Sequence, residues 1–89
     1  MDPLLQQQVA MLVVIDQQRA VAPEADHKHW QAASDCIAGA RNLDIALSML
    51  ISGQQNTRIS ARRDAFAFAA ELARKAIIAE PVAIAEAEE

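Results

Sequence analysis

The chain has 89 residues, 20 alanines, three aromatic residues and a formal net charge of −4. A chain of this length makes one domain and buries roughly 60 to 65% of the surface that its unfolded form exposes, so its own core is modest. The acidic balance argues against a nucleic-acid binder, because phosphate backbones attract positive charge, and the abundance of alanine predicts an all-α fold.

A first helix is predicted over about residues 3–21. Asp2 can cap free backbone amides, and Pro3 is favourable at the first helical position, where its missing N–H has no partner to lose. Pro23 disfavours helical geometry at the residue before it, so the helix ends near Val21.

Seven consecutive residues without a polar side chain, Val9 to Ile15, lie inside this helix. At about 3.6 residues per turn they form an apolar ring around the whole helix. A small bundle covers only part of the circumference of any one helix. We therefore expect a second copy of the chain or another protein to cover the rest. A buried β-strand is the competing interpretation because four of the seven residues are β-branched, but a lone strand would have no partner.

A second helix is predicted over about residues 24–51. Glu24 and Asp26 suit its first turn, where carboxylates face the positive end of the helix dipole. Gly39 interrupts the pattern, either to let a neighbouring helix approach or at a cost of about 1 kcal/mol relative to alanine. Apolar residues at spacings of three and four predict one broad buried face: Trp30, Ala33, Ile37, Ala40, Leu43, Leu47, Leu50 and Ile51.

Residues 52–56 form the clearest break in the sequence, with Gly53 placed as a left-handed helix terminator. A third helix is predicted over about residues 57–79, and Pro81 is expected to stop it. The sequence thus predicts a bundle of three helices in a single domain over residues 1–80. Residues 81–89 form an acidic tail of alanine and glutamate, for which a short fourth helix and a frayed end are the two alternatives.

The third helix repeats the all-round apolar character of the first over Ala65 to Ala70. Two such rings in one short chain favour homo-oligomerisation into a dimer or a larger helical bundle. The competing interpretation is a monomer with a few exposed alanines and valines. The residues that we expect at the interface between copies are Val9, Leu12, Val13 and Phe66.

Motifs for catalysis are missing from the sequence. Gly39 and Gly53 are the only glycines, so the sequence contains no glycine-rich phosphate-binding loop. His27 and His29 are two residues apart and point about 200° away from each other on a helix, so they cannot grip one metal ion together. A two-ligand site of Asp26 and His29 completed by a partner chain is the weaker alternative to solvated side chains. We expect no enzyme activity, no metal and no cofactor.

The single cysteine, Cys36, excludes an internal disulfide and is typical of a reducing compartment. Its place next to Ile37 is typical of a small buried hydrophobic residue, and neither histidine has the helical spacing of a base for a cysteine nucleophile. The first residues lack the basic region of a signal peptide, and the apolar run is far shorter than the ~20 residues of a membrane span. A cytoplasmic protein without a membrane partner is expected.

A local group of cations follows the predicted break. Between Arg58 and Lys75 there are five basic and two acidic residues. Arginines in the first turns of a helix oppose its dipole, and residues that break a local rule merit a functional interpretation. The candidate site for a phosphate or carboxylate group consists of Gln55, Asn56, Thr57, Arg58, Arg62 and Arg63. The simpler interpretation is a solvated face whose arginines pair with nearby carboxylates, including those of the acidic tail.

These observations predict a non-enzymatic interaction protein that associates with itself and binds and regulates or inhibits another protein. The alternative function is an oligomeric binder of a small phosphate-bearing ligand, such as a nucleotide, held by the arginines. A nucleic-acid partner is not expected, since the net charge is negative.

Overall fold

The computed structural model describes residues 2–88, with side-chain placement for residues 2–78. It contains α1 (Pro3–Val21), the short 3-10 helix η1 (Glu24–Asp26), α2 (His27–Ala38), α3 (Leu43–Gln55) and α4 (Ser60–Glu88). This part of the chain has no strand. The all-α prediction is confirmed.

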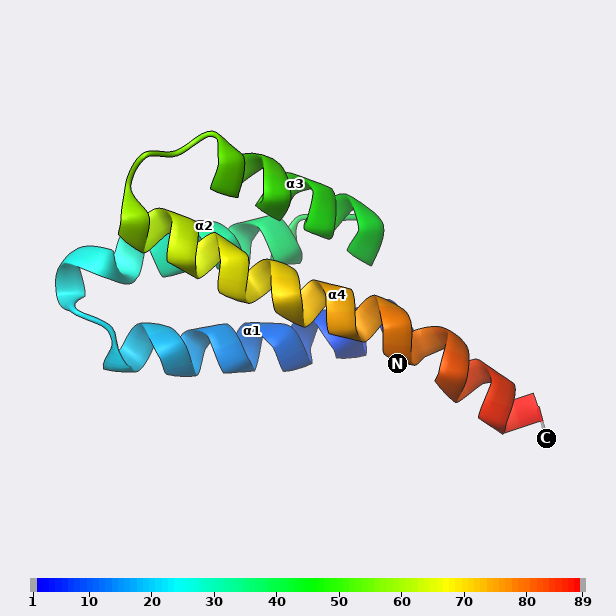
Figure 1. Ribbon diagram of the computed structural model, residues 1–89. Coiled ribbons are helices and arrows are strands. Elements are labelled where there is room, and N and C mark those ends of the chain that lie inside the picture. The colour runs from blue at the N-terminus through cyan, green and yellow to red at the C-terminus, as the bar shows by residue number, and fades with distance from the viewer. Residues whose placement is uncertain (1, 89) are drawn as a thin grey trace.

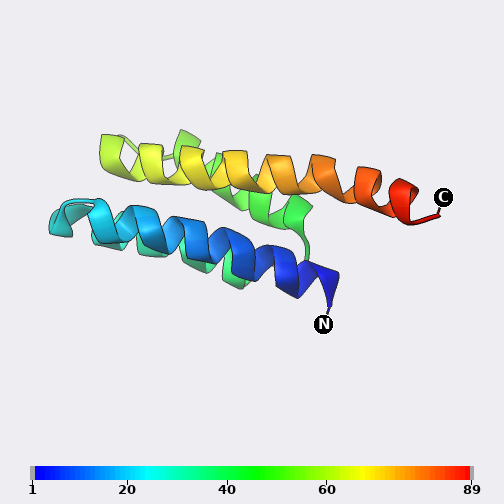
Figure 2. The same cartoon turned by 90° about the horizontal axis from the view of Figure 1, so that it is seen from below.

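Successive helices run in opposite directions, and α4 is the longest (Figure 1). α1 packs mainly on α2, and α3 packs mainly on α4, so the bundle consists of two helix pairs. α2 and α4 make the principal contact between the pairs. Figure 2 shows the C-terminal part of α4 continuing past the start of α1. The molecule is therefore elongated, with extents of 48 × 24 × 17 Å.

α1 begins and ends where the sequence predicts. The Asp2 carboxylate accepts a hydrogen bond from the Leu4 backbone N–H at 3.1 Å, and Pro3 occupies the first helical position. The apolar ring around α1 divides into a buried and an exposed side. Met11 and Ile15 enter the core, whereas Val9 and Val13 stay about half exposed.

The prediction of one helix over 24–51 is wrong, because the chain breaks at residues 39–42. η1 precedes α2, and α2 ends at Ala38 with Gly39 as its C-cap. Asn42 then adopts an extended backbone, and its side-chain oxygen accepts a hydrogen bond from the Ile45 N–H at 2.8 Å. Asparagine is among the best residues for capping a helix start. This cap begins a new helix and makes the bundle one of four helices.

Gln8 of α1 stabilises this break from the neighbouring helix. Its buried side-chain amide donates hydrogen bonds to the carbonyl of Ile37 at 2.9 Å and to that of Ala40 at 3.0 Å. The last carbonyls of a helix have no partner within it and need one when they are buried. Gln8 supplies that partner and fixes the position of α1 along α2.

Gly53 does not terminate a helix, contrary to the prediction. It has no positive φ, and α3 continues through it to Gln55. Its role is close approach: a Cβ atom built on Gly53 would lie 2.1 Å from Cε2 of Phe66. The Phe66 ring of α4 thus occupies the space that the side chain of any residue other than glycine would need at position 53.

Both ends of the third predicted helix differ from the structure. α4 begins at Ser60 rather than 57, because Thr57 accepts a hydrogen bond from the Ile59 N–H at 3.2 Å and holds a turn before the helix. At the other end α4 does not stop at Pro81 but continues to Glu88. Proline interrupts one backbone hydrogen bond, while the alanines and glutamates that follow are strong helix formers.

The core is built around small residues of α4. They pack against larger side chains from the other helices, among them Ile15, Ile37 and Leu50, each with no exposed surface. Alanine lets helix axes approach closely but contributes only one methyl group to the buried area. The buried core residues of α4 are Ala65, Phe66, Ala69, Ala70 and Ala73.

Replacing Gly53 by alanine is expected to destabilise the fold by about 1–3 kcal/mol, because the added methyl group overlaps the buried Phe66 ring. Gly39→Ala is the matched control, since a Cβ atom there would meet only the Asp35 carbonyl oxygen at 3.3 Å. Urea denaturation followed by circular dichroism measures both. Equal stability of the two variants would contradict the packing argument.

Candidate functional site

The outer side of α1 carries a row of aliphatic side chains. Leu5, Val9 and Val13 are 46%, 48% and 51% exposed, respectively. Residues four apart share a helix face, so the three form one continuous apolar row, here named the α1 face. The sequence-based expectation that the bundle leaves part of the apolar ring uncovered is met on this side of the helix.

A groove between α1 and α2 runs beside this row. Its apolar part has a volume of about 530 Å³, and a second hollow of about 470 Å³ continues it toward the α1–α2 connection. Asp16, Arg19 and Gln31 line both parts, so the two hollows form one groove. The apolar part is lined by Val9, Leu12, Val13, Asp16, Gln17, Arg19, Gln31 and Ser34.

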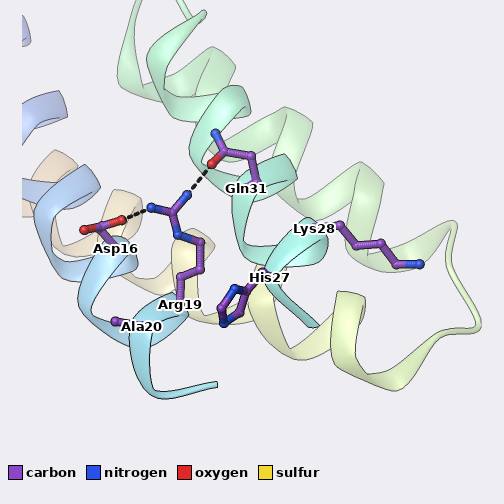
Figure 3. Close-up of a pocket in the computed structure, with 6 residues that line it drawn as sticks. All are labelled: Asp16, Arg19, Ala20, His27, Lys28 and Gln31. Atoms are coloured by element: carbon purple, nitrogen blue, oxygen red, sulfur yellow. Dashed lines mark hydrogen bonds and ion pairs between the residues drawn. The ribbon is translucent and has the colours of Figure 1, made fainter. Parts of the chain in front are cut away.

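Arg19 organises the polar end of the groove (Figure 3). Its guanidinium donates to the side-chain oxygen of Gln31 across the groove and to the Asp16 carboxylate on its own helix. These bonds use two of the five N–H donors of a guanidinium, and the Arg19 side chain remains 37% exposed. Arg19 can therefore donate hydrogen bonds to a further carboxylate from outside.

Two more basic side chains stand at this end. The His27 ring is hydrogen-bonded through Nε2 to the Ala22 carbonyl at 3.0 Å, which fixes it beside the end of α1. Lys28 extends away from the Arg19 contact, on the solvent side of α2 (Figure 3). The groove thus changes from aliphatic to charged toward the end of α1, where Arg19 and Lys28 lie beside the Asp16 carboxylate.

The structure brings together three of the four predicted interface residues. Val9, Leu12 and Val13 line the same groove. Phe66 is not on the surface: it is 3% exposed and packs against Gly53. The second apolar ring is also largely covered by the chain itself. Ala65, Phe66, Ala69 and Ala70 are buried, and the Phe68 ring meets Trp30 edge-on with centroids 5.5 Å apart.

The predicted arginine cluster divides into separate environments. Arg62 points into the bundle, where its guanidinium lies 5.0 Å from the centre of the Phe66 ring and 3.4 Å from Nδ1 of the buried His29. Arg58 is exposed in the connection before α4. Arg63 turns to the other side and donates to the Thr57 carbonyl at 3.4 Å. Arg58, Arg62 and Arg63 therefore do not form one site.

Some residues of the candidate anion site lie together in a second groove, beside an arginine that the sequence analysis did not single out. Arg74 lies three turns beyond Arg63 on the same side of α4, and an eleven-residue spacing is the signal that would have identified it. Asn56 is not in this groove and donates instead to the Ser52 hydroxyl at 3.2 Å. The groove between α3 and α4 is lined by Ile51, Gln54, Gln55, Thr57, Arg63 and Arg74.

Cys36 is partly buried near the core. Burial raises the pKa of its thiol, the Asp35 carboxylate raises it further, and the Arg62 guanidinium opposes both effects. The thiol is thus held in its neutral, unreactive form. Over the described part of the chain, no three His, Cys, Asp or Glu side chains are grouped as metal ligands.

No protein-family model matches this chain, and neither a curated protein nor a solved structure does so. Across residues 2–88, none of the helices is long and apolar enough to cross a bilayer. The function must therefore be inferred from the geometry of the grooves and of the α1 face.

Alkylation of Cys36 by iodoacetamide is expected to have a higher pH midpoint in the folded protein than in the urea-unfolded chain, because only the thiolate reacts. The stabilisation that comes from the neutral thiol is complete below the ordinary pKa of about 8.5. It is lost as the pH rises through the raised folded value. Cys36→Ala should lack this alkaline loss of stability. A lower midpoint in the folded protein would contradict the assignment.

Proposed function

We propose that this chain is a small non-enzymatic interaction protein that binds another protein chain through the α1 face and the adjoining α1–α2 groove. By covering part of the partner's surface, it regulates or inhibits that partner. The observation that carries the proposal is the half-exposed row of Leu5, Val9 and Val13 beside the groove. Contiguous exposed apolar patches with polar rims are typical of protein-binding surfaces.

The energetics support binding at this surface. Each half-exposed aliphatic side chain that a partner buries contributes about 1 kcal/mol. The row is also held rigidly in place, since Met11 and Ile15 on the opposite side of α1 are buried in the core. A surface held rigid before binding loses little conformational freedom when a partner docks.

The groove residues favour recognition over catalysis. Three aliphatic side chains, Val9, Leu12 and Val13, line its apolar part beside five polar ones, and the Asp16 carboxylate is already paired with Arg19. We also propose a cytoplasmic site of action, supported by the single free cysteine, which is typical of a reducing compartment. The partners that we propose are a second copy of the chain and another protein.

The double variant Val9→Gln, Val13→Gln is expected to lose partner binding while the fold persists, because both side chains are already about half exposed. The measurement is a paired affinity capture with tagged wild-type and variant chains, from cells that also contain untagged copies of the chain. Any protein or copy recovered by the wild type should be reduced at least tenfold with the variant.

Val21→Gln is the matched control, because Val21 is 81% exposed but lies outside the groove. It should recover the same chains as the wild type. If no captured chain depends on Val9 and Val13, the α1 face is not a binding surface and the proposed function fails.

A second candidate function is the binding of a small phosphate-bearing ligand, favoured by the position of Arg63 and Arg74 in one groove of about 460 Å³. Gln55 and Thr57 contribute polar side chains to the same groove. Guanidinium groups recognise phosphate through paired N–H donors. Arg74 already donates to Glu71 at 3.1 Å, so a phosphate would compete with that carboxylate.

Inorganic phosphate and a panel of nucleotides test this second function by their effect on thermal unfolding. A ligand at a hundred times its dissociation constant should add about 2.7 kcal/mol of stability. Arg63→Ala combined with Arg74→Ala should abolish that shift, whereas Arg58→Ala, outside the groove, should retain it. A wild-type melting curve that no phosphate compound moves would exclude the site.

A further inference from the structure

The connection between α2 and α3, residues 39–42, keeps part of the geometry of a helix. Gly39 has helical backbone angles, φ −89° and ψ −5°, and its N–H donates to the Asp35 carbonyl at 3.0 Å as it would inside an α-helix. Asn42 departs from the helix, with φ −155° and ψ 171°. The connection contains no proline, no β-branched residue and no positive φ. Its residues are therefore able to form a continuous helix.

Two side chains at the break take the places of backbone groups that a continuous helix would supply. In an α-helix the carbonyls of Ile37 and Ala40 would accept from the backbone N–H groups four residues later. Here the Gln8 amide donates to both, at 2.9 and 3.0 Å. The Asn42 side chain accepts from the Ile45 N–H, which a continuous helix would direct to a backbone carbonyl. Gln8 and Asn42 therefore stabilise the break against continuation of α2 into α3.

The buried residues of α2 and α3 also fit one continuous helix. At about 100° per residue they would all lie within about half of its circumference. These residues are His29, Ala33, Ile37, Ala40, Leu43, Ala46 and Leu50. A joined helix over residues 27–55 would therefore bury one side and leave the opposite side to solvent.

Joining α2 to α3 would separate the two helix pairs of one chain, because α2 and α3 now run in opposite directions (Figure 1). The contacts between the pairs would then lack their partners. They include the Trp30 ring against Phe68 and the Arg62 guanidinium 3.4 Å from Nδ1 of His29. A second chain that is joined in the same way supplies identical partners for all of these contacts.

A two-fold axis through the two 39–42 segments gives this dimer its geometry. The joined helices lie antiparallel, so the α2 part of each lies beside the α3 part of the other, as α2 lies beside α3 in the single chain. Gly39 and Ala40 are then near the axis, where residues with little or no side chain let two backbones approach. The contacts within and between the pairs are kept, and only the connection changes.

We propose that residues 39–42 are a hinge through which two chains exchange their α1–α2 pairs. In the exchanged dimer α2 and α3 form one helix in each chain, and the α1–α2 pair of each chain packs on the α3–α4 pair of the other. The break between α2 and α3 belongs to the single chain. Exchange of identical elements is a low-cost route to a dimer. It does not use the α1 face and so goes beyond the proposed function.

Cross-linking between two differently tagged chains tests the exchange. Gln7 and Ala76 meet between the pairs, where the Gln7 amide donates to the Ala76 carbonyl at 3.4 Å. In a Cys36→Ala background, a tagged Gln7→Cys chain and an untagged Ala76→Cys chain are refolded together from urea at high concentration and treated with a short bismaleimide. We expect a linked pair of one tagged and one untagged chain. A single chain with both cysteines should link within itself at low concentration, which shows that the reagent spans the contact.

The matched control uses a contact within one pair. Arg19 and Gln31 meet across the α1–α2 groove, and exchange leaves both in the same chain. In the same background, a tagged Arg19→Cys chain refolded with an untagged Gln31→Cys chain should give no mixed pair. Mixed pairs in both mixtures would indicate chains that associate side by side, and the absence of a mixed pair from the first mixture would indicate no exchange. Either result overturns the hinge.

Two substitutions in the otherwise unchanged chain should shift the hinge in opposite directions. Asn42→Ala removes the cap that only the break requires and favours the joined helix, so the dissociation constant of the dimer should fall about tenfold. Asp44→Pro should raise it about a hundredfold, because proline is tolerated in the first turn of α3 but would interrupt a joined helix. Light scattering over a range of concentrations measures both, and circular dichroism shows that each variant is folded.

The outcomes separate this inference from the proposed function. If the wild type and Asn42→Ala both stay monomeric at high concentration, or if Asp44→Pro dimerises as the wild type does, the hinge is overturned. Neither result concerns the α1 face. Val9→Gln with Val13→Gln leaves residues 39–42 unchanged and should not alter the exchange, so a failure of valine-dependent capture would overturn the proposed function alone.

Discussion

The close contact between small residues of α4 and the helices around it is the constraint on which the structure depends. Ala65, Ala69 and Ala73 have no exposed surface, and the Phe66 ring fills the place of a side chain at Gly53. Such a core brings helix axes together but removes little apolar area from water per residue. The larger aliphatic residues that this core cannot accommodate remain outside. The same alanine-rich composition therefore explains both the narrow bundle and its uncovered α1 face.

The helical nature of the chain and the bounds of α1 followed from composition and from the Asp2–Pro3 start signal. The break after Gly39 did not, because the apolar pattern continues across it without a change of spacing. What ends α2 is partly non-local: the Gln8 side chain reaches its carbonyls from another helix. Gly53 was misread for a related reason. A glycine required by a neighbouring ring has the same sequence signal as one required by a turn.

The candidate site was predictable only where it depended on local spacing. Val9, Leu12 and Val13 share a groove because neighbouring residues of one helix stay together in any packing. Phe66 and Arg62 were misplaced because inward and outward directions on α4 depend on tertiary contacts, including the stacking of Arg62 on Phe66. Arg74 was missed although the predicted third helix contains both arginines, because only the packing of α3 against α4 shows that Arg63 and Arg74 line one groove. The charged end of the groove depends on the bend between α1 and α2, which sequence alone does not place.

The contact between Trp30 and Phe68 has a spectroscopic consequence. Trp30 belongs to α2 and Phe68 to α4, and their rings meet at 75° across the junction of the two helix pairs. The chain contains one tryptophan and no tyrosine. Its intrinsic fluorescence therefore originates from a single indole at that junction. Separation of the two helix pairs would change the emission even when every helix remains formed, so the fluorescence of Trp30 reports on tertiary rather than secondary structure.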